Sequence, residues 1–128
     1  MRQADAVIIG GGPAGLAAAV ELYHKGITDI LILERESSLG GILKQCIHDG
    51  FGLSRFGETL SGPEYAQRFI DQVEELEIPY ITDATVIRLT GDKKVYAASR
   101  EGIIEIQAKA VMLAMGCRER TRGAISIP

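Results

Sequence analysis

The sequence predicts an α/β fold in which a parallel sheet carries helices on both faces and a small antiparallel β meander. Three observations support this prediction. A strand-helix-strand pattern occupies residues 5–34, its second strand is an uninterrupted apolar run, and three short β-rich segments follow a later amphipathic helix. Strand, helix and strand within about thirty residues are typical of a right-handed βαβ unit.

The first unit combines two apolar strands with a helix rich in alanine and leucine. Residues 5–9 predict a short buried strand of mostly β-branched residues. Residues 14–25 predict a helix, and Gly26 is a favourable residue just after its end. Residues 29–34 contain four consecutive apolar side chains, which indicate a strand covered on both faces, as in a parallel sheet.

A second helix is predicted to begin at Ser61, because Glu64 follows three residues later as in a capping box. Pro79 is expected to end this helix, and residues 80–81 to begin a short strand. The helix carries one apolar stripe at spacings of four, four and three residues, made of Tyr65, Phe69, Val73 and Leu76.

Three β-rich runs follow, at residues 85–89, 95–98 and 103–106, separated by turn residues. This spacing predicts an antiparallel meander inserted between elements of the main sheet. Residues 110–115 are apolar again and end at Gly116. We therefore expect the chain to return to the parallel sheet there.

The composition limits the classes of partner. The chain has 128 residues and a formal net charge of −3, which fits one domain or part of a larger one. A weakly acidic chain without a run of Lys and Arg is not expected to bind nucleic acid. We find no signal peptide and no run near the ~18 apolar residues of a membrane span. We expect a cytoplasmic protein without a metal site, whose Cys46 and Cys117 are free thiols.

One glycine motif carries the chemistry. Gly10, Gly12 and Gly15 form a Gly-x-Gly-x-x-Gly pattern between the first strand and the first helix. In this pattern Gly10 permits the tight turn, Gly12 leaves room for a pyrophosphate, and Gly15 allows the helix to pack closely on the strand. The free N–H groups at the helix start then hold the phosphates. Glu34 ends the next strand, where a carboxylate accepts hydrogen bonds from ribose hydroxyls. The alternative is a glycine turn that packs a helix without a ligand.

Together with two further motifs, this pattern resembles the FAD-binding domain of the pyridine nucleotide-disulfide reductase and thioredoxin reductase-like flavoproteins. The motifs are Val-Ile-Ile-Gly-Gly-Gly-Pro-Ala-Gly at 7–15, Glu-Arg at 34–35 with Gly-Gly at 40–41, and Val-Met-Leu-Ala-Met-Gly at 111–116. The resemblance implies a Rossmann-like FAD/NAD(P)-binding fold. The cofactor-binding residues that we assign are Gly10, Gly12, Pro13, Ala14, Gly15, Glu34, Arg35, Gly40, Gly41, Val86, Ala114, Met115 and Gly116.

The resemblance also implies a function. The family is expected to transfer a hydride between NAD(P)H or a reduced substrate and FAD, and no catalytic residue is assigned. In this group the second glycine pair passes beside the ribityl-pyrophosphate of FAD, and the third motif touches the flavin nucleotide. Met115 stands where the group usually has Thr. A hydroxyl contact is therefore lost there, whereas backbone contacts are retained.

The same resemblance implies that residues 1–128 are the N-terminal part of the FAD-binding domain. The NAD(P)-binding domain and the Gly-Asp return segment of such proteins are not in this sequence. We therefore expect the chain alone to be inactive and to self-associate or need a partner chain. Residues 41–50 and 116–122 further resemble the flavoproteins that accompany an anaerobic glycerol-3-phosphate dehydrogenase.

Three residues after the second glycine pair are candidates for a direct role. Cys46 has no second cysteine nearby, so we expect a loop residue and not a dithiol relay. His48 has a side chain suited to acid-base chemistry near neutral pH. Lys44 is a candidate for the pyrimidine edge of the flavin, its alternative being a solvated lysine. Two other functions stay open, namely an NAD-binding dehydrogenase domain and a non-catalytic dinucleotide-binding subunit.

Overall fold

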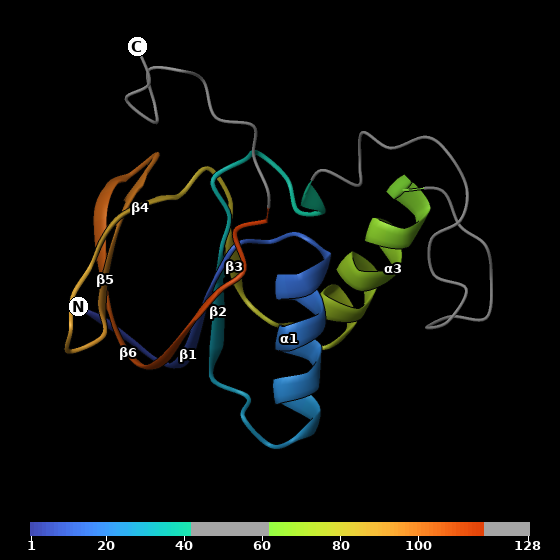
Figure 1. Cartoon of the computed structure of the whole chain (residues 1–128), viewed down its shortest axis with the longest axis horizontal. Coiled ribbons are helices and arrows are strands. Elements are labelled where there is room, and N and C mark those ends of the chain that lie inside the picture. Colours follow the sequence, from blue (N-terminus) through green and yellow to red (C-terminus); the bar gives the residue numbers. More distant parts are fainter. Residues whose placement is uncertain (42–61, 117–128) are drawn as a thin grey trace, which may run out of the picture.

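A computed structural model describes residues 1–41 and 62–116. Within these ranges it shows a six-stranded mixed sheet and two helices beside it (Figure 1). The elements in chain order are β1 (Arg2–Ile9), α1 (Pro13–His24), β2 (Ile30–Leu33), α3 (Gly62–Glu75), β3 (Tyr80–Ile81), β4 (Thr85–Leu89), β5 (Lys94–Ser99) and β6 (Gly102–Leu113). The predicted α/β class is confirmed.

The sheet combines a parallel half with an antiparallel half. Its strand order is β3-β2-β1-β6-β5-β4. β1 pairs in parallel with both β2 and β6, and β2 pairs in parallel with β3. The remaining pairs, β6 with β5 and β5 with β4, are antiparallel. All four residues of β2 are buried, as its continuous apolar run predicts.

The structure corrects the prediction for residues 103–115. Two separate strands were expected, at 103–106 and 110–115, but β6 is one continuous strand of 12 residues. Its first half pairs with β5 and its second half with β1, so Ile106 lies opposite Val95 on one side and Arg2 on the other. The meander is therefore the antiparallel continuation of the main sheet and not an insertion between its elements.

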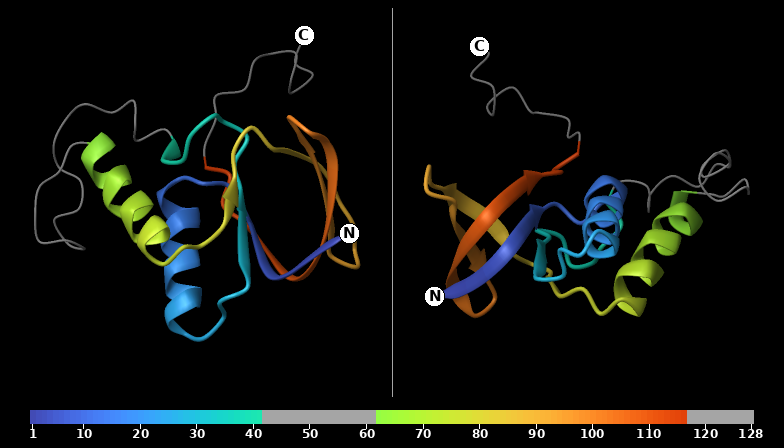
Figure 2. Two further views of the ribbon diagram at one scale, coloured as in Figure 1. Left: turned by 180° about the vertical axis from the view of Figure 1, so that it is seen from behind. Right: turned by 90° about the horizontal axis from the view of Figure 1, so that it is seen from below.

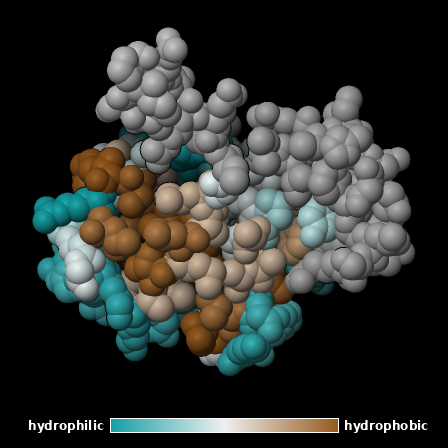
Figure 3. Space-filling model, in the orientation of Figure 1, coloured by the Kyte–Doolittle hydropathy of each residue, from teal (hydrophilic) through white to brown (hydrophobic). Residues whose placement is uncertain are grey.

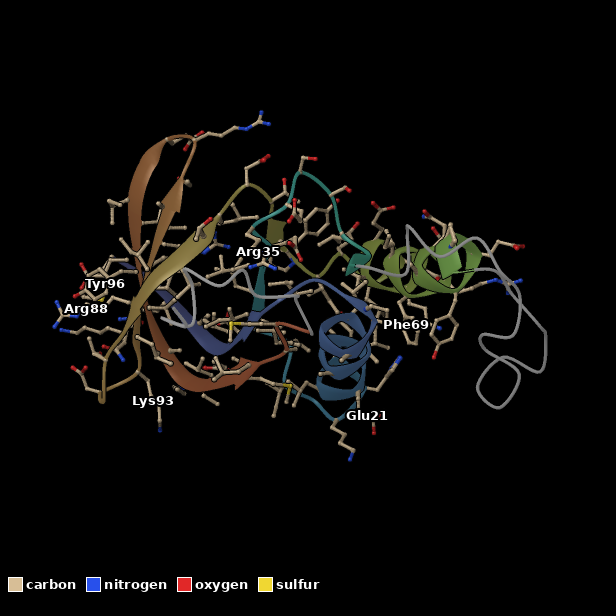
Figure 4. The ribbon with its side chains drawn as sticks, turned by 45° about the horizontal axis from the view of Figure 1, so that its top comes forward. Glu21, Arg35, Phe69, Arg88, Lys93 and Tyr96 are labelled. Atoms are coloured by element: carbon tan, nitrogen blue, oxygen red, sulfur yellow. The ribbon has the colours of Figure 1, made fainter. Side chains whose placement is uncertain are left out.

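The two described helices lie on the same face of the sheet, whereas helices were expected on both faces. Side chains of α1 and α3 share one apolar cluster with Ile8, Ile30 and Ile32. In α3, Phe69 points toward α1 and meets Tyr65 edge to face, with ring centroids 5.1 Å apart (Figure 4).

The other face of β1 and β2 is covered by the curled antiparallel half (Figure 2). Val7 and Leu31 share a second apolar cluster with Val95, Ala97 and Ile106 of the antiparallel strands. Both faces of β2 and of the second half of β1 are therefore buried.

Candidate functional site

The carboxyl ends of β1, β2 and β6 meet at one edge of the sheet (Figure 1). Ile9 lies opposite Leu33 of β2 and Leu113 of β6. Just beyond the strands, the N–H of Gly10 donates to the carbonyl oxygen of Leu33 at 2.9 Å, and the N–H of Ala114 donates to that of Ile9 at 2.8 Å. Ligands of open α/β sheets bind outside such carboxyl ends. The structure thus brings the three predicted motifs together at the edge where a ligand is expected.

Gly10 and Gly15 are required by the fold itself. Gly10 has a φ of 120°, and a methyl group on it would collide with the carbonyl oxygen of Ala114. A methyl group on Gly15 would collide with the carbonyl oxygen of Gly10 and lie 3.2 Å from a methyl carbon of Ile8. These close contacts set the turn from β1 into α1.

Gly12 is different, because nothing among the described residues requires glycine there. Its φ of −80° and ψ of −177° are extended backbone values that any residue adopts. The nearest atom to a methyl group on it would be the Cα of Gly41 at 3.7 Å, an ordinary contact distance. The space in front of Gly12 therefore fits a group that approaches the backbone closely, as a pyrophosphate does.

The start of α1 is suited to an anion. Gly12 is its N-cap, Pro13 occupies the first turn, and the structure shows no side-chain hydrogen bond at this cap and no acidic residue in the first turn. The N–H groups at a helix start have no partner within the helix, and the helix dipole makes this end positive. Phosphate groups are typical ligands of such an end when a glycine-rich turn precedes it. Ala14, in the same turn, is exposed.

Glu34 lies beside this turn. Its side chain is charged but buried, and the residue is only 6% exposed. Its carboxylate accepts a hydrogen bond from the N–H of Gly11 at 2.8 Å and another from the N–H of Glu36 at 2.7 Å. An ionised carboxylate has about four acceptor positions. Glu34 can therefore hold the glycine turn and still accept a hydrogen bond from a ribose hydroxyl.

Arg35 and Val86 lie near the same end of β2. Arg35 is exposed where β2 ends (Figure 4), and its Nε lies 3.8 Å from a carboxylate oxygen of Glu36, a weak surface pair. Val86 is half-buried in β4. The chain that enters β4 is bonded to the end of β2, because the N–H of Ala84 donates to the carbonyl oxygen of Glu34 at 2.9 Å. The assignment of Val86 to the cofactor stays a prediction.

The second glycine pair contacts the first glycine turn. Gly40 and Gly41 have φ values of 120° and 65°, a backbone region that favours glycine. The N–H of Gly40 donates to the carbonyl oxygen of Gly11 at 2.8 Å. A methyl group on Gly41 would lie 3.0 Å from the Cα of Gly12. The two glycine motifs, 25 residues or more apart in sequence, thus form one continuous backbone surface.

The third motif adds two exposed residues beside this backbone surface. Met115 is 61% exposed, and Gly116 follows with a φ of 70°. Both lie directly after Ala114, whose carbonyl oxygen faces Gly10. Residues 42–61 and 117–128 are outside the described ranges, so the predictions for Lys44, Cys46, His48 and Cys117 stay predictions.

Two residues at the glycine turn, one within it and one packed against it, are missing from the set assigned from the sequence. Gly11 lies between two motif glycines, and a methyl group on it would lie 2.6 Å from a methyl carbon of Leu39. Leu39 itself is 4% exposed, in a segment whose preceding residues are exposed. The sequence signal that could have identified Leu39 is its position as an isolated leucine between polar residues and the second glycine pair.

A separate hollow of about 320 Å³ lies between the segment after β2, α3 and β3. None of the predicted cofactor-binding residues lines it. Burial, the negative charge of Glu74 and a hydrogen bond to it raise the pKa of Tyr80, whose hydroxyl donates to Glu74 at 3.3 Å. The hollow is lined by Ser37, Ser38, Leu39, Gln67, Ile70, Glu74, Tyr80 and Thr82.

Metal binding and membrane crossing find no support in the described part of the chain. No group of three or more His, Cys, Asp and Glu side chains there is arranged to hold a metal ion. No helix of residues 1–41 and 62–116 combines the length and the apolar character that crossing a membrane requires.

Comparison with known proteins identifies the family. The family model described as pyridine nucleotide-disulphide oxidoreductase matches residues 4–127. The chain belongs to this family, which confirms the resemblance seen in its motifs. The finer resemblance to flavoproteins that accompany an anaerobic glycerol-3-phosphate dehydrogenase stays a prediction.

Sequence relatives belong to several kinds of protein. The chain is 32% identical to hydrogen cyanide synthase subunit HcnB of Pseudomonas protegens, covering 90% of this chain and 25% of that protein. It is 33% identical to thioredoxin reductase of Ureaplasma parvum, covering 91% and 36%. It is 32% identical to sarcosine oxidase subunit alpha of a Corynebacterium species, covering 91% and 13%. The chain therefore spans little more than a third of such relatives at most.

Solved structures with the same fold agree with this assignment. Thioredoxin reductase from Streptococcus pyogenes is 27% identical with a TM-score of 0.71, covering 93% of this chain and 37% of that one. L-proline dehydrogenase from P. horikoshii is 27% identical with a TM-score of 0.77, covering 93% and 24%. A flavin-containing monooxygenase from Stenotrophomonas maltophilia is 26% identical with a TM-score of 0.69, covering 91% and 39%.

The different positions of Gly12 and Gly15 lead to a testable prediction. Gly12→Ala should leave a folded chain, because its backbone is extended and its surroundings have room, with a loss of stability of about 1 kcal/mol or less. It should weaken ADP binding tenfold or more, ~1.4 kcal/mol. Gly15→Ala should not fold stably. Circular dichroism with urea denaturation measures folding, and calorimetric titration measures binding.

The contrast between the two variants is the control. If Gly12→Ala folds and binds ADP as tightly as the parent chain, Gly12 does not face the ligand. If Gly15→Ala is as stable as the parent, the close contact with Gly10 does not determine the turn.

Proposed function

We propose that this chain forms the nucleotide-binding part of the FAD-binding domain of a flavin-dependent oxidoreductase. One observation carries the proposal: among the described residues nothing crowds Gly12, which lies at the start of α1, where no side chain caps the helix, and next to the turn that the carboxylate of Glu34 holds. Membership of the pyridine nucleotide-disulphide oxidoreductase family supports it. On this proposal, residues 1–128 are the N-terminal part of that domain.

Different residues bind different parts of the dinucleotide. The N–H groups at the start of α1 and the backbone of Gly12 and Gly41 bind the pyrophosphate. Glu34 accepts hydrogen bonds from the adenosine ribose while it holds the N–H of Gly11. The backbone after β6, at Met115, borders the flavin half. When bound, FAD supplies the hydride-transfer chemistry, and we propose NAD(P)H as the electron donor.

The second glycine pair favours FAD over NAD in this proposal. A plain NAD-binding dehydrogenase domain does not require Gly40 and Gly41 after the acidic residue. Here both adopt positive φ values and contact the first glycine turn. The similarity to a solved flavin-containing monooxygenase also favours FAD over NAD.

We also propose that an exposed apolar surface is covered by a second copy or a partner chain. Figure 3 shows apolar surface over the part of the molecule where the strands lie. Such surfaces mark interaction sites in soluble proteins. Two relatives are named as subunits, HcnB and sarcosine oxidase subunit alpha. Large exposed side chains on β4, at the two ends of β6 and just after β6 are Ile87, Leu89, Ile103, Met112, Leu113 and Met115.

Binding of four ligands to the 128-residue chain tests the proposed function. ADP and FAD should bind with affinities within about tenfold of each other, ~1.4 kcal/mol, because both contain the half that the described residues hold. FMN lacks that half and should not bind. Calorimetric titration measures ADP and NAD, and fluorescence quenching measures FAD and FMN. FMN binding as tightly as FAD, or NAD binding over tenfold more tightly than FAD, would contradict the proposal.

Glu34 gives a second test of the same site. Glu34→Gln keeps the side-chain volume but replaces one acceptor oxygen with a donor, so one backbone N–H loses its partner. The affinity for ADP should fall about tenfold, which corresponds to ~1.4 kcal/mol.

The matched control is Glu21→Gln, which changes an exposed glutamate in α1, far along the helix from Gly12 (Figure 4). This variant should bind ADP like the parent chain. Equal ADP affinity in both variants would show that neither a ribose contact of Glu34 nor its hydrogen bond to Gly11 contributes to nucleotide binding.

A further inference from the structure

The polar groups of Gly11 are held from both sides by the segment that follows β2. Its N–H donates to the carboxylate of Glu34 at 2.8 Å. Its carbonyl oxygen accepts a hydrogen bond from the N–H of Gly40 at 2.8 Å. Residues 34–40 therefore contact the peptide groups on both sides of Gly11, next to the Gly12 backbone assigned to the pyrophosphate.

Leu39 is the side chain that fixes this segment to the core. Residues 35–38 are exposed, whereas Leu39 is 4% exposed and belongs to the apolar cluster that includes Leu16 and Ile8. Its methyl carbon would lie 2.6 Å from a methyl group on Gly11, so it lies directly over the glycine turn. Burial of a leucine is favourable by about 1.5–3 kcal/mol, which exceeds the net contribution of about 1 kcal/mol from one hydrogen bond.

We propose that Leu39 is a positioning residue for the dinucleotide, a role that rests on the proposed function. It holds Gly40 and Gly41 against Gly11 and Gly12 before any ligand arrives. The two glycine motifs then present one preformed backbone surface to the pyrophosphate. Without this anchor the second glycine pair would be free to leave the first, and the nucleotide would have to order it.

A preformed site has a measurable consequence for affinity. If loss of the anchor leaves the competent arrangement populated in about a tenth of the molecules, the apparent affinity falls about tenfold. The N–H of Gly40 should also lose protection from hydrogen exchange in the ligand-free chain, because its bond to Gly11 opens more often. The second effect needs no cofactor and reports on the segment directly.

The test uses three variants of the 128-residue chain and ADP as the ligand. Leu39→Ala removes the anchor. Leu39→Met is the conservative variant, since it keeps the volume and the apolar character. Val73→Ala is the matched core control, because Val73 is fully buried in the same cluster but lies in α3. ADP affinity is measured by titration well below each unfolding midpoint, and amide exchange at Gly40 by NMR.

We expect both alanine variants to unfold at lower temperature, whereas ADP affinity falls about tenfold only in Leu39→Ala and returns in Leu39→Met. Exchange at Gly40 should accelerate in Leu39→Ala and stay slow in Val73→Ala. If Leu39→Ala does not fold, Leu39→Val replaces it with the same expected direction.

The possible outcomes distinguish the proposed nucleotide binding from the proposed role of Leu39. Failure of the parent chain to bind ADP overturns the proposed function, and the role of Leu39 with it. Binding of ADP by the parent and equally by Leu39→Ala overturns the role of Leu39 alone. Equal loss of affinity in Leu39→Ala and Val73→Ala shows a general effect of stability and also overturns that role.

Discussion

The site depends on one close backbone contact, between the carbonyl oxygen of Gly10 and the Cα of Gly15. No side chain fits at either position, so α1 begins almost in contact with the end of β1. The parallel pairing of β1 with β2 and β6 places the end of that strand between two others. This geometry points the start of α1 at the edge where the three strands end.

Around that contact, polar interactions hold the glycine turn, and apolar packing holds the segment after β2. The carboxylate of Glu34 accepts hydrogen bonds from the N–H groups of Gly11 and Glu36, so backbone donors satisfy this buried side chain. Leu39 brings the following segment back to the core. Among Gly10, Gly12 and Gly15, only Gly12 has room for a methyl group among the described residues, which separates the glycine that a ligand needs from the glycines that the fold needs.

The sequence allowed the local part of this arrangement to be predicted. The βαβ unit, the spacing of Gly10, Gly12 and Gly15, and the acid at position 34 all lie within one stretch of chain, where periodicity and spacing are informative. The resemblance to the pyridine nucleotide-disulphide oxidoreductase family, now confirmed, added the second and third motifs.

The rest depends on contacts that are distant in sequence. β6 appeared as two strands because polar residues interrupt its apolar pattern. In the structure Gln107 lies within the strand and donates to backbone carbonyl oxygens of Asp92 and Lys93, while Lys109 is exposed. The curled antiparallel half covers the face where a second helix layer was expected, and no local pattern encodes that curl. Leu39 was missed because one leucine in a polar segment has no periodicity.

The most direct test of the account is a nitrogen-labelled NMR titration of the chain with ADP. ADP should shift the amide resonances of Gly12, Ala14, Gly15 and Gly41 together, with one dissociation constant, because these N–H groups border the proposed pyrophosphate position. Resonances of the β4–β5 turn, such as Gly91, should not move. Shifts confined to the hollow beside Tyr80, or no shift at the start of α1 at saturating ADP, would contradict it.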